Sequence, residues 1–157
     1  MRLNLLCVGK TQDQEIRTLI QYYLERMPKH WNVEITEIPD SKANKNLSPD
    51  QVKIGEGKTL LSHIDNGDWV VLLDEKGKQF TSREFAQKME HWLGNSFRRI
   101  HLIIGGAWGF SEEIYQRSNE KIALSKMTFT HQMVRLFLME QLYRSDQILK
   151  GKPYHND

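Results

Sequence analysis

The strongest constraint on the fold is the alternation of short apolar runs with segments in which apolar residues recur every three or four positions. Runs of strand length are found at residues 2–8, 32–38, 69–73, 100–104 and 121–124. Helical periodicity fills the intervals between them. Strands that alternate with helices are typical of a parallel sheet with helices on both faces. The sequence therefore predicts an α/β fold, and no repeat or linker divides residues 1–157, so we expect a single domain.

Local signals indicate where the helices begin. In two capping boxes, a Ser or Thr and a Gln or Glu three residues later satisfy each other's backbone: Ser48 with Gln51, and Thr81 with Glu84. Single caps are predicted at Asp13, Ser111 and Thr130. The predicted helices span residues 13–27, 48–64, 81–93, 111–115 and 130–150. Two connections are expected to be irregular, a polar loop at 39–47 and a turn at 74–78.

Composition excludes several classes of function. The chain has one cysteine, Cys7, so no disulfide can form within it, and its apolar surroundings predict a core residue. The six histidines are scattered without the close spacing of a zinc motif, so we expect no metal. No apolar run approaches the ~20 residues that span a bilayer. We therefore expect a cytoplasmic protein without a membrane segment. The net charge of +2 permits nucleic-acid binding without requiring it.

Three loops follow predicted strands at the edge where parallel sheets bind ligands, after Leu73, Ile104 and Leu124. The second is glycine-rich (GGAWG, 105–109), which allows a ligand close to the backbone, although a tight turn without a ligand has the same composition. It matches neither the P-loop nor the dinucleotide fingerprint. The third loop, at 124–129, offers hydroxyls to a polar ligand and Met and Phe to a flat ring. Alternatively, its apolar members pack on the core.

Two further features carry groups capable of chemistry. His131 follows the predicted cap Thr130, where free backbone amides favour an anionic or carbonyl partner. His131 is a candidate base or hydrogen-bond donor, or an ordinary surface side chain. The tail at 152–155 (KPYH) combines cationic, aromatic and imidazole groups that suit a nucleobase and a phosphate. A disordered terminus is the alternative for these residues.

Together these segments carry a resemblance. LNLLCVGK at 3–10, LDEKGK at 73–78, IGGAWG at 104–109, LSKMTFTHQMVR at 124–135, EQLYR at 140–144 and PYH at 153–155 occur in order along the chain. In these motifs the chain resembles the ribosomal large-subunit pseudouridine N3-methyltransferase family, a minimal group of SPOUT methyltransferases. Two departures are Thr130, where the family often has proline, and the individual residues Ala107 and Trp108 within the glycine-rich loop.

The resemblance implies a SPOUT-type fold whose carboxyl-terminal part forms a trefoil knot, an exception to the usual absence of knots. It implies a homodimer with its active site at the subunit interface, and S-adenosylmethionine as methyl donor. The residues implied to bind this donor are Leu73, Gly105, Gly106, Leu124, Ser125, Lys126, Met127, Thr128 and Phe129. The candidate catalytic residues are His155, Tyr154, Arg144 and His131, with His155 the first choice of base.

The implied reaction methylates N3 of a pseudouridine in 23S ribosomal RNA. Because the chain has no appended RNA-binding module, we expect the assembled ribosome to be the substrate. Candidate phosphate contacts are Lys10, Arg98, Arg99, Lys126 and Arg135, each of which is also compatible with an ordinary surface charge. Two alternatives stay open: methylation of another RNA such as tRNA, and a non-catalytic ribosome-binding or assembly protein.

Overall fold

A computed structural model describes residues 2–41 and 46–155. The strands are β1 (Leu3–Val8), β2 (Val33–Ile38), β3 (Trp69–Gln79), β4 (Ile100–Ile104) and β5 (Glu120–Ala123). The helices are α1 (Gln14–Leu24), α2 (Pro49–Leu61), α3 (Ser82–Gly94), α4 (Glu112–Arg117) and α5 (His131–Leu149), with a short 3₁₀ turn, η1 (Lys29–Trp31). The predicted alternation of strands and helices is confirmed.

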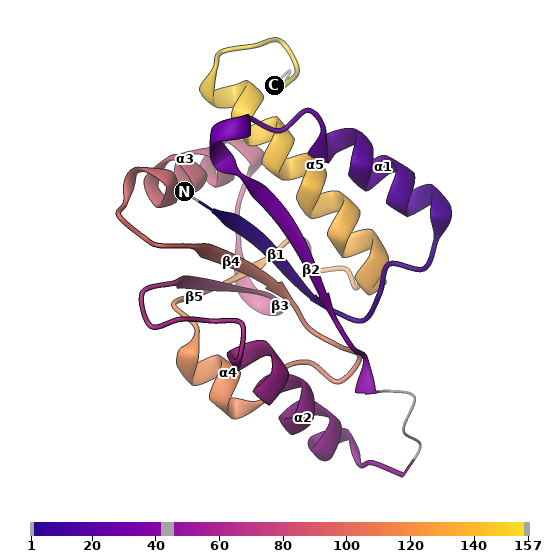
Figure 1. Cartoon of the computed structure of the whole chain (residues 1–157). Helices are drawn as coiled ribbons and strands as arrows, with labels where there is room; N and C mark the ends of the chain where they lie inside the picture. The colour runs from indigo at the N-terminus through magenta and orange to yellow at the C-terminus, as the bar shows by residue number, and fades with distance from the viewer. Residues whose placement is uncertain (1, 42–45, 156–157) are drawn as a thin grey trace.

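The five strands form one parallel sheet in the order β2-β1-β4-β3-β5. Helices α1, α3 and α5 cover one face, and α2 and α4 cover the other (Figure 1). The predicted α/β fold with helices on both faces is therefore confirmed. The threading of the carboxyl-terminal part into a knot stays a prediction.

Strand β1 contributes apolar side chains to both faces of the sheet. Leu3, Leu5 and Cys7 belong to the core beneath α1, α3 and α5, whereas Leu6 and Val8 belong to the core beneath α2 and α4. This division follows from the alternation of side chains along a strand. Cys7 is fully buried, as predicted, and burial raises the pKa of its thiol to about 12.

The predicted turn at 74–78 is wrong, because β3 continues to Gln79. Leu73 pairs with Ile122 of β5, and Lys78 pairs with the same residue after a shift in register. Gly77 makes this second pairing possible. A Cβ atom at position 77 would lie 2.5–2.7 Å from backbone atoms of Ile122, so only glycine fits without moving one of the strands.

Asp13 and Ser111 stand at the predicted N-cap positions, but the capping hydrogen bond expected of their side chains is absent. The Asp13 side chain makes no capping hydrogen bond, and the Asp13 backbone N–H instead donates to Gln132 of α5 at 2.8 Å. The Ser111 hydroxyl does not cap α4. It lies where a Cβ atom of Gly57 would be, so it fills the close approach of α2 and α4. In both cases a tertiary contact determines the geometry of the helix start.

The remaining caps are confirmed. Both capping boxes, Ser48 with Gln51 and Thr81 with Glu84, form in full, and Thr130 accepts a hydrogen bond from the Met133 backbone. Their partners are all within three residues, so local sequence is enough to predict them. Of the polar loop predicted at 39–47, residues 42–45 lie outside the described part of the chain.

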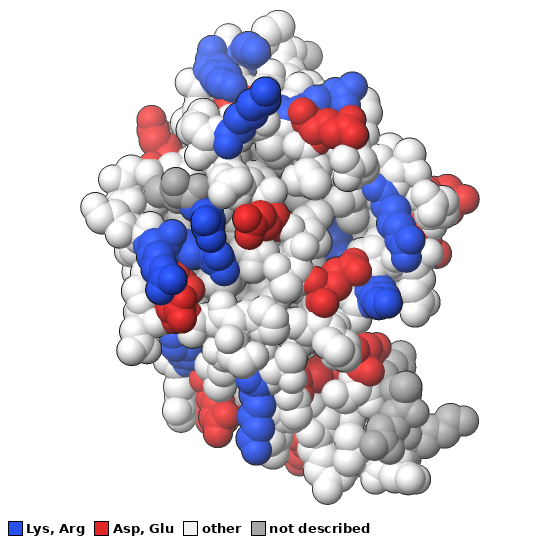
Figure 2. Space-filling view, viewed as in Figure 1, with Lys and Arg blue, Asp and Glu red and all other residues white. Residues whose placement is uncertain are grey.

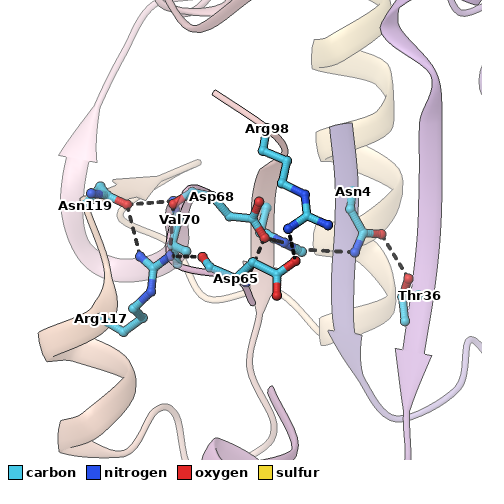
Figure 3. A network of polar contacts seen from close by, with 9 residues as sticks. Asn4, Thr36, Asp65, Asp68, Val70, Arg98, Arg117 and Asn119 are labelled. Atoms are coloured by element: carbon cyan, nitrogen blue, oxygen red, sulfur yellow. Dashed lines mark hydrogen bonds and ion pairs between the residues drawn. The ribbon is translucent and has the colours of Figure 1, made fainter. Parts of the chain in front are cut away.

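A buried polar chain crosses the amino-terminal part of the sheet (Figure 3). The Thr36 hydroxyl donates to the side-chain Oδ1 of Asn4 at 3.0 Å, and the side-chain Nδ2 of Asn4 lies 3.3 Å from Nδ1 of His101. Nε2 of His101 lies 3.0 Å from Asp68. Since an amide nitrogen can only donate, Nδ1 accepts and Nε2 carries the hydrogen. Burial lowers the pKa of His101 despite its hydrogen bond to Asp68. The imidazole is therefore held neutral.

Candidate functional site

The three strand ends selected from the sequence meet around one pocket. Its volume is about 460 Å³, within the roughly 300–1,000 Å³ usual for small-molecule and cofactor sites. The pocket is lined by residues 73–76 of β3, by residues 104–110 at the end of β4 and after it, and by residues 122–125 and 127–129 at the end of β5 and after it. Tyr115 of α4 and the start of α5 complete the lining. Parallel β3, β4 and β5 bring these segments to the same edge of the sheet.

The pocket gathers nearly all the residues implied to bind the methyl donor. Those that line it are Leu73, Gly105, Gly106, Leu124, Ser125, Met127, Thr128 and Phe129. Lys126 is exposed and does not line the pocket. The Ser125 hydroxyl accepts a hydrogen bond from the Met127 backbone at 3.0 Å, which folds the 124–129 segment locally.

A tight turn forms the wall after β4. The Gly109 N–H donates to the Gly106 carbonyl at 3.1 Å, and Gly109 has a φ of +80°, which favours glycine. A Cβ atom at Gly105 would lie 2.9 Å from the Phe110 ring, and one at Gly106 would overlap the carboxylate of Glu56. Because Gly105 and Gly106 carry no side chains, the turn packs tightly against Phe110 and Glu56 on one side, while its backbone lines the pocket on the other. We call residues 105–109 the glycine turn.

Behind the glycine turn lies a buried carboxyl group, Glu56 of α2, with an exposed fraction of 3%. Its Oε1 is 3.4 Å from the Ser41 backbone N–H, and its Oε2 has no hydrogen-bond partner among the described residues. Burial raises the pKa of Glu56, and the nearby Asp40 raises it further. No local pattern indicated this packing, because α2 and the glycine turn meet only in the folded chain.

An acidic residue at the pocket mouth was missed by the sequence reasoning. Asp74 lines the pocket immediately after Leu73 and accepts a hydrogen bond from the Tyr115 hydroxyl at 2.5 Å. Burial and the adjoining carboxylate raise the pKa of Tyr115 to about 12, so the phenol stays protonated as the donor. The position of Asp74 directly after an apolar strand was the signal that could have revealed it.

His131 also lines this pocket, at the first residue of α5. Thr130, the cap before it, accepts from the Met133 N–H at 3.3 Å, so the helix begins in a defined position next to the 124–129 segment. The imidazole is therefore placed at the same site as the three strand ends.

The sequence that forms this site matches a known protein family. Residues 1–155 match the family model described as a predicted SPOUT methyltransferase. The chain belongs to the SPOUT methyltransferase family. Its similarity to individual members covers the whole sequence.

Three curated relatives carry the name ribosomal RNA large subunit methyltransferase H. The chain is 49% identical to that of Christiangramia forsetii over 156 residues, covering 99% of both chains. It is 45% identical to that of Bacteroides thetaiotaomicron over 157 residues, covering 100% of both. It is 42% identical to that of Flavobacterium psychrophilum over 156 residues, covering 99% of both.

In this SPOUT chain, the other three candidate catalytic residues gather far from the pocket. Arg144 lies 2.5 Å from the Glu140 carboxylate and 3.0 Å from Nδ1 of His155. The Tyr154 hydroxyl donates to Glu140 at 3.3 Å, and the Arg144 guanidinium lies 4.8 Å from the Tyr154 ring centroid. We call Glu140, Arg144, Tyr154 and His155 the tail cluster. The hydrogen bond to Glu140 raises the pKa of Arg144.

The tail cluster and the pocket lie at opposite ends of α5 (Figure 1). An α-helix rises about 1.5 Å per residue, so His131 and Arg144 are about 20 Å apart along its axis. The four candidate catalytic residues therefore form two groups within one subunit, with His131 in the pocket and the other three in the tail cluster.

One predicted phosphate contact is wrong. Arg135 has an exposed fraction of 2% and its guanidinium donates to the carbonyls of Val8 and Gly9 at 2.7 and 2.9 Å. It also donates to Thr11 at 2.8 Å and to Glu37 at 3.2 Å. Arg135 thus fixes α5 to the carboxyl end of β1 and is not accessible to RNA.

The other candidate phosphate contacts are scattered. Lys10 and Lys126 are exposed, whereas Arg98 and Arg99 precede β4, at the end of this strand opposite the pocket. Arg98 pairs with Asp65 at 2.8 Å. On the face shown in Figure 2, basic and acidic side chains are interspersed. In the described residues, no group of three His, Cys, Asp or Glu could hold a metal ion, and no helix could cross a membrane.

Proposed function

We propose that the chain transfers a methyl group from S-adenosylmethionine to N3 of a pseudouridine in 23S ribosomal RNA, on the assembled ribosome. The observation that carries this proposal is the single pocket at three adjoining strand ends, built from the motif segments 73–78, 104–109 and 124–135. The relatives are named as large-subunit ribosomal RNA methyltransferases, which supports the substrate class. A ribosomal substrate would place the protein in the cytoplasm.

The pocket suits the methyl donor in size and composition. When bound, S-adenosylmethionine supplies a methyl group made electrophilic by a sulfonium. The glycine turn lines the pocket, and the absence of side chains at Gly105 and Gly106 lets its backbone lie close against Phe110 and Glu56. The 124–129 segment adds hydroxyls and apolar side chains, and Leu73 adds an apolar wall. Lys126 belongs to the same segment but does not line the pocket.

We further propose that the active site is completed by a second copy of the chain. The tail cluster is separated from His131 by about 20 Å along α5, so one subunit does not combine them. A homodimer with its pocket facing the partner's tail cluster would bring all the candidate catalytic groups together. Symmetric pairs are the commonest assemblies of soluble proteins, which agrees with this arrangement.

The tail cluster supplies groups for managing the acceptor. The imide N3 of pseudouridine is a poor nucleophile until its proton is removed, so a positioned base is required. Arg144 would stabilise negative charge on a base carbonyl, and Tyr154 would position the base by stacking or hydrogen bonding. His155 is the first candidate base and His131 the second.

The geometry adds a condition to the role of His155. Guanidinium groups only donate, so Nδ1 of His155 accepts from Arg144 at 3.0 Å and is occupied by that bond. To receive a proton at Nδ1, His155 must first leave Arg144. Arg144 would then be available to the acceptor base, so substrate binding and base activation would be linked by this exchange.

The first test is calorimetric titration of the purified protein with S-adenosylmethionine, with the oligomeric state measured on the same sample. We expect saturable binding to a dimer and methylation of ribosomes that lack the modification. Absence of binding at millimolar concentration, with or without ribosomes, would favour a non-catalytic ribosome-binding protein. Methylation of tRNA with inactive ribosomes would favour the alternative RNA substrate.

The second test concerns the base. Replacing His155 with Ala should lower kcat far more than it weakens binding of S-adenosylmethionine. The matched control is His91→Ala, which removes an exposed imidazole at the end of α3. Unchanged turnover of His155→Ala would remove His155 from the role of base and direct attention to His131.

A further inference from the structure

Trp108 differs from the other tryptophans in having no partner within the described part of the chain. Trp31 and Trp92 are buried in the core, and the Trp69 ring stacks on Phe97 with centroids 4.5 Å apart. Trp108 has an exposed fraction of 53%. Among the described residues it makes no hydrogen bond and no ring contact. Hydrogen bonds and ring contacts within the described part of the subunit therefore do not account for this side chain.

The backbone that carries Trp108 is held firmly. Trp108 is the third residue of the four-residue turn closed by the hydrogen bond from Gly109 to Gly106. The turn is braced from behind, because Gly105 packs on the Phe110 ring. Phe110 in turn contacts Tyr115 edge-to-face, with centroids 5.8 Å apart. A large aromatic side chain on a braced turn is positioned in advance for binding, which reduces the entropy lost on contact.

Trp108 lies at the pocket that we propose for methyl transfer, and Met127 lines the same pocket with an exposed fraction of 74%. The two side chains come from different loops. The strand ends, including Leu73 and Ile104, form the inner wall, so the side chains that stay most exposed are those that meet a molecule arriving from solvent. At a methyltransferase pocket that molecule is the acceptor RNA.

We propose that Trp108 binds the RNA substrate by stacking on a nucleobase at the mouth of the pocket. The inference rests on the proposed function, because it requires an RNA acceptor at this site. Stacking of bases on aromatic side chains is the usual way in which single-stranded or unstacked RNA is held by proteins.

The kinetic test compares three substitutions. Trp108→Ala should lower kcat/KM for unmethylated ribosomes by about 5- to 150-fold, the range expected for loss of one base–aromatic stack. Trp108→Phe keeps a ring and should retain most of the activity, whereas Trp108→Leu keeps apolar bulk without a ring and should resemble Trp108→Ala. Binding of S-adenosylmethionine and the oligomeric state should stay unchanged in all three. Full activity of Trp108→Leu or Trp108→Ala would overturn the proposal.

A fluorescence titration tests the contact without requiring turnover. Trp108 is the most exposed tryptophan, so the difference between wild type and Trp108→Phe isolates its emission. A short oligouridylate should quench wild type and leave Trp108→Phe nearly unchanged. If wild type proved inactive but this quenching occurred, the proposed reaction would fail and the RNA contact would stand. Quenching by S-adenosylmethionine alone would show that Trp108 contacts the methyl donor. Loss of the dimer in Trp108→Ala would place Trp108 in the subunit interface. Either result would overturn the proposal.

Discussion

Replacing Gly77 with Ala tests whether the close approach of β3 and β5 supports the pocket. The added Cβ atom would lie 2.5, 2.6 and 2.7 Å from the C, N and Cα atoms of Ile122. Carbon atoms in contact prefer about 3.5–4.0 Å, so the strands must separate by about 1 Å. The atoms that clash are backbone, and pairing of Ile122 with both Leu73 and Lys78 holds them in place. No change of rotamer can relieve the overlap.

The expected loss of stability is about 3 kcal/mol, the upper end of the 1–3 kcal/mol usual for overpacking, because the backbone itself must move. For a chain of this length the midpoint of thermal unfolding should fall by roughly 6–12 °C. The displaced β5 leads into the 124–129 segment, so binding of S-adenosylmethionine should weaken as well. The backbone of Gly77 is not left-handed, so the effect is steric.

Gly55→Ala in α2 is the matched control. Apart from its chain neighbours and the backbone of α2, no atom of the described residues lies within 4 Å of the Cβ position there. The same substitution should therefore stabilise the helix by about 0.5–1 kcal/mol. Urea unfolding followed by circular dichroism, at one protomer concentration, measures both variants. If Gly77→Ala were as stable as wild type, or gained stability like Gly55→Ala, the reasoning from the close contact would be refuted.

Two further predictions concern buried polar groups. Because burial lowers the pKa of His101 below its ordinary value of 6.5, the unfolded chain binds the proton more readily. This contribution to stability is complete above about pH 6.5 and is lost as the pH falls through the lowered pKa. Urea unfolding between pH 7 and 5 should show the decline in the free energy of unfolding, and the part of the decline that comes from His101 should be absent in His101→Gln. A flat wild-type profile would contradict the assignment. Arg135→Met should destabilise the protein by about 3–5 kcal/mol in the same assay, because Glu37 loses its cationic partner and two strand-end carbonyls lose their donor. Arg135→Lys should lose less, and a loss below about 1 kcal/mol for Arg135→Met, as for a surface pair, would show that the buried guanidinium matters little.

Local sequence determined the features whose physical cause lies within a few residues. The strands were predictable because β1 and β4 are mostly apolar runs of strand length that are buried on both faces. The capping boxes at Ser48 and Thr81 were predictable because each donor and acceptor are three residues apart. The pocket was also predictable in outline, since parallel strands bring the loops after Leu73 and Ile104 to one edge.

Tertiary structure decided the features whose partners are distant in sequence. From its residue type, Arg135 was expected at the surface. In the folded chain it is buried, and its guanidinium donates to the carbonyls of Val8 and Gly9 at the end of β1. Ser111 precedes a helix like an ordinary cap, yet its hydroxyl fills the space left by Gly57.

The extension of β3 past Leu73 likewise depends on β5, which pairs with it from more than forty residues away. Asp74 and Tyr115 meet across a similar separation, so their hydrogen bond at the pocket mouth was not visible in either local pattern. Residue type and spacing determine which elements form and which edge of the sheet carries the pocket. Burial and hydrogen bonding depend on which distant groups fill the remaining space, and only the folded chain specifies that.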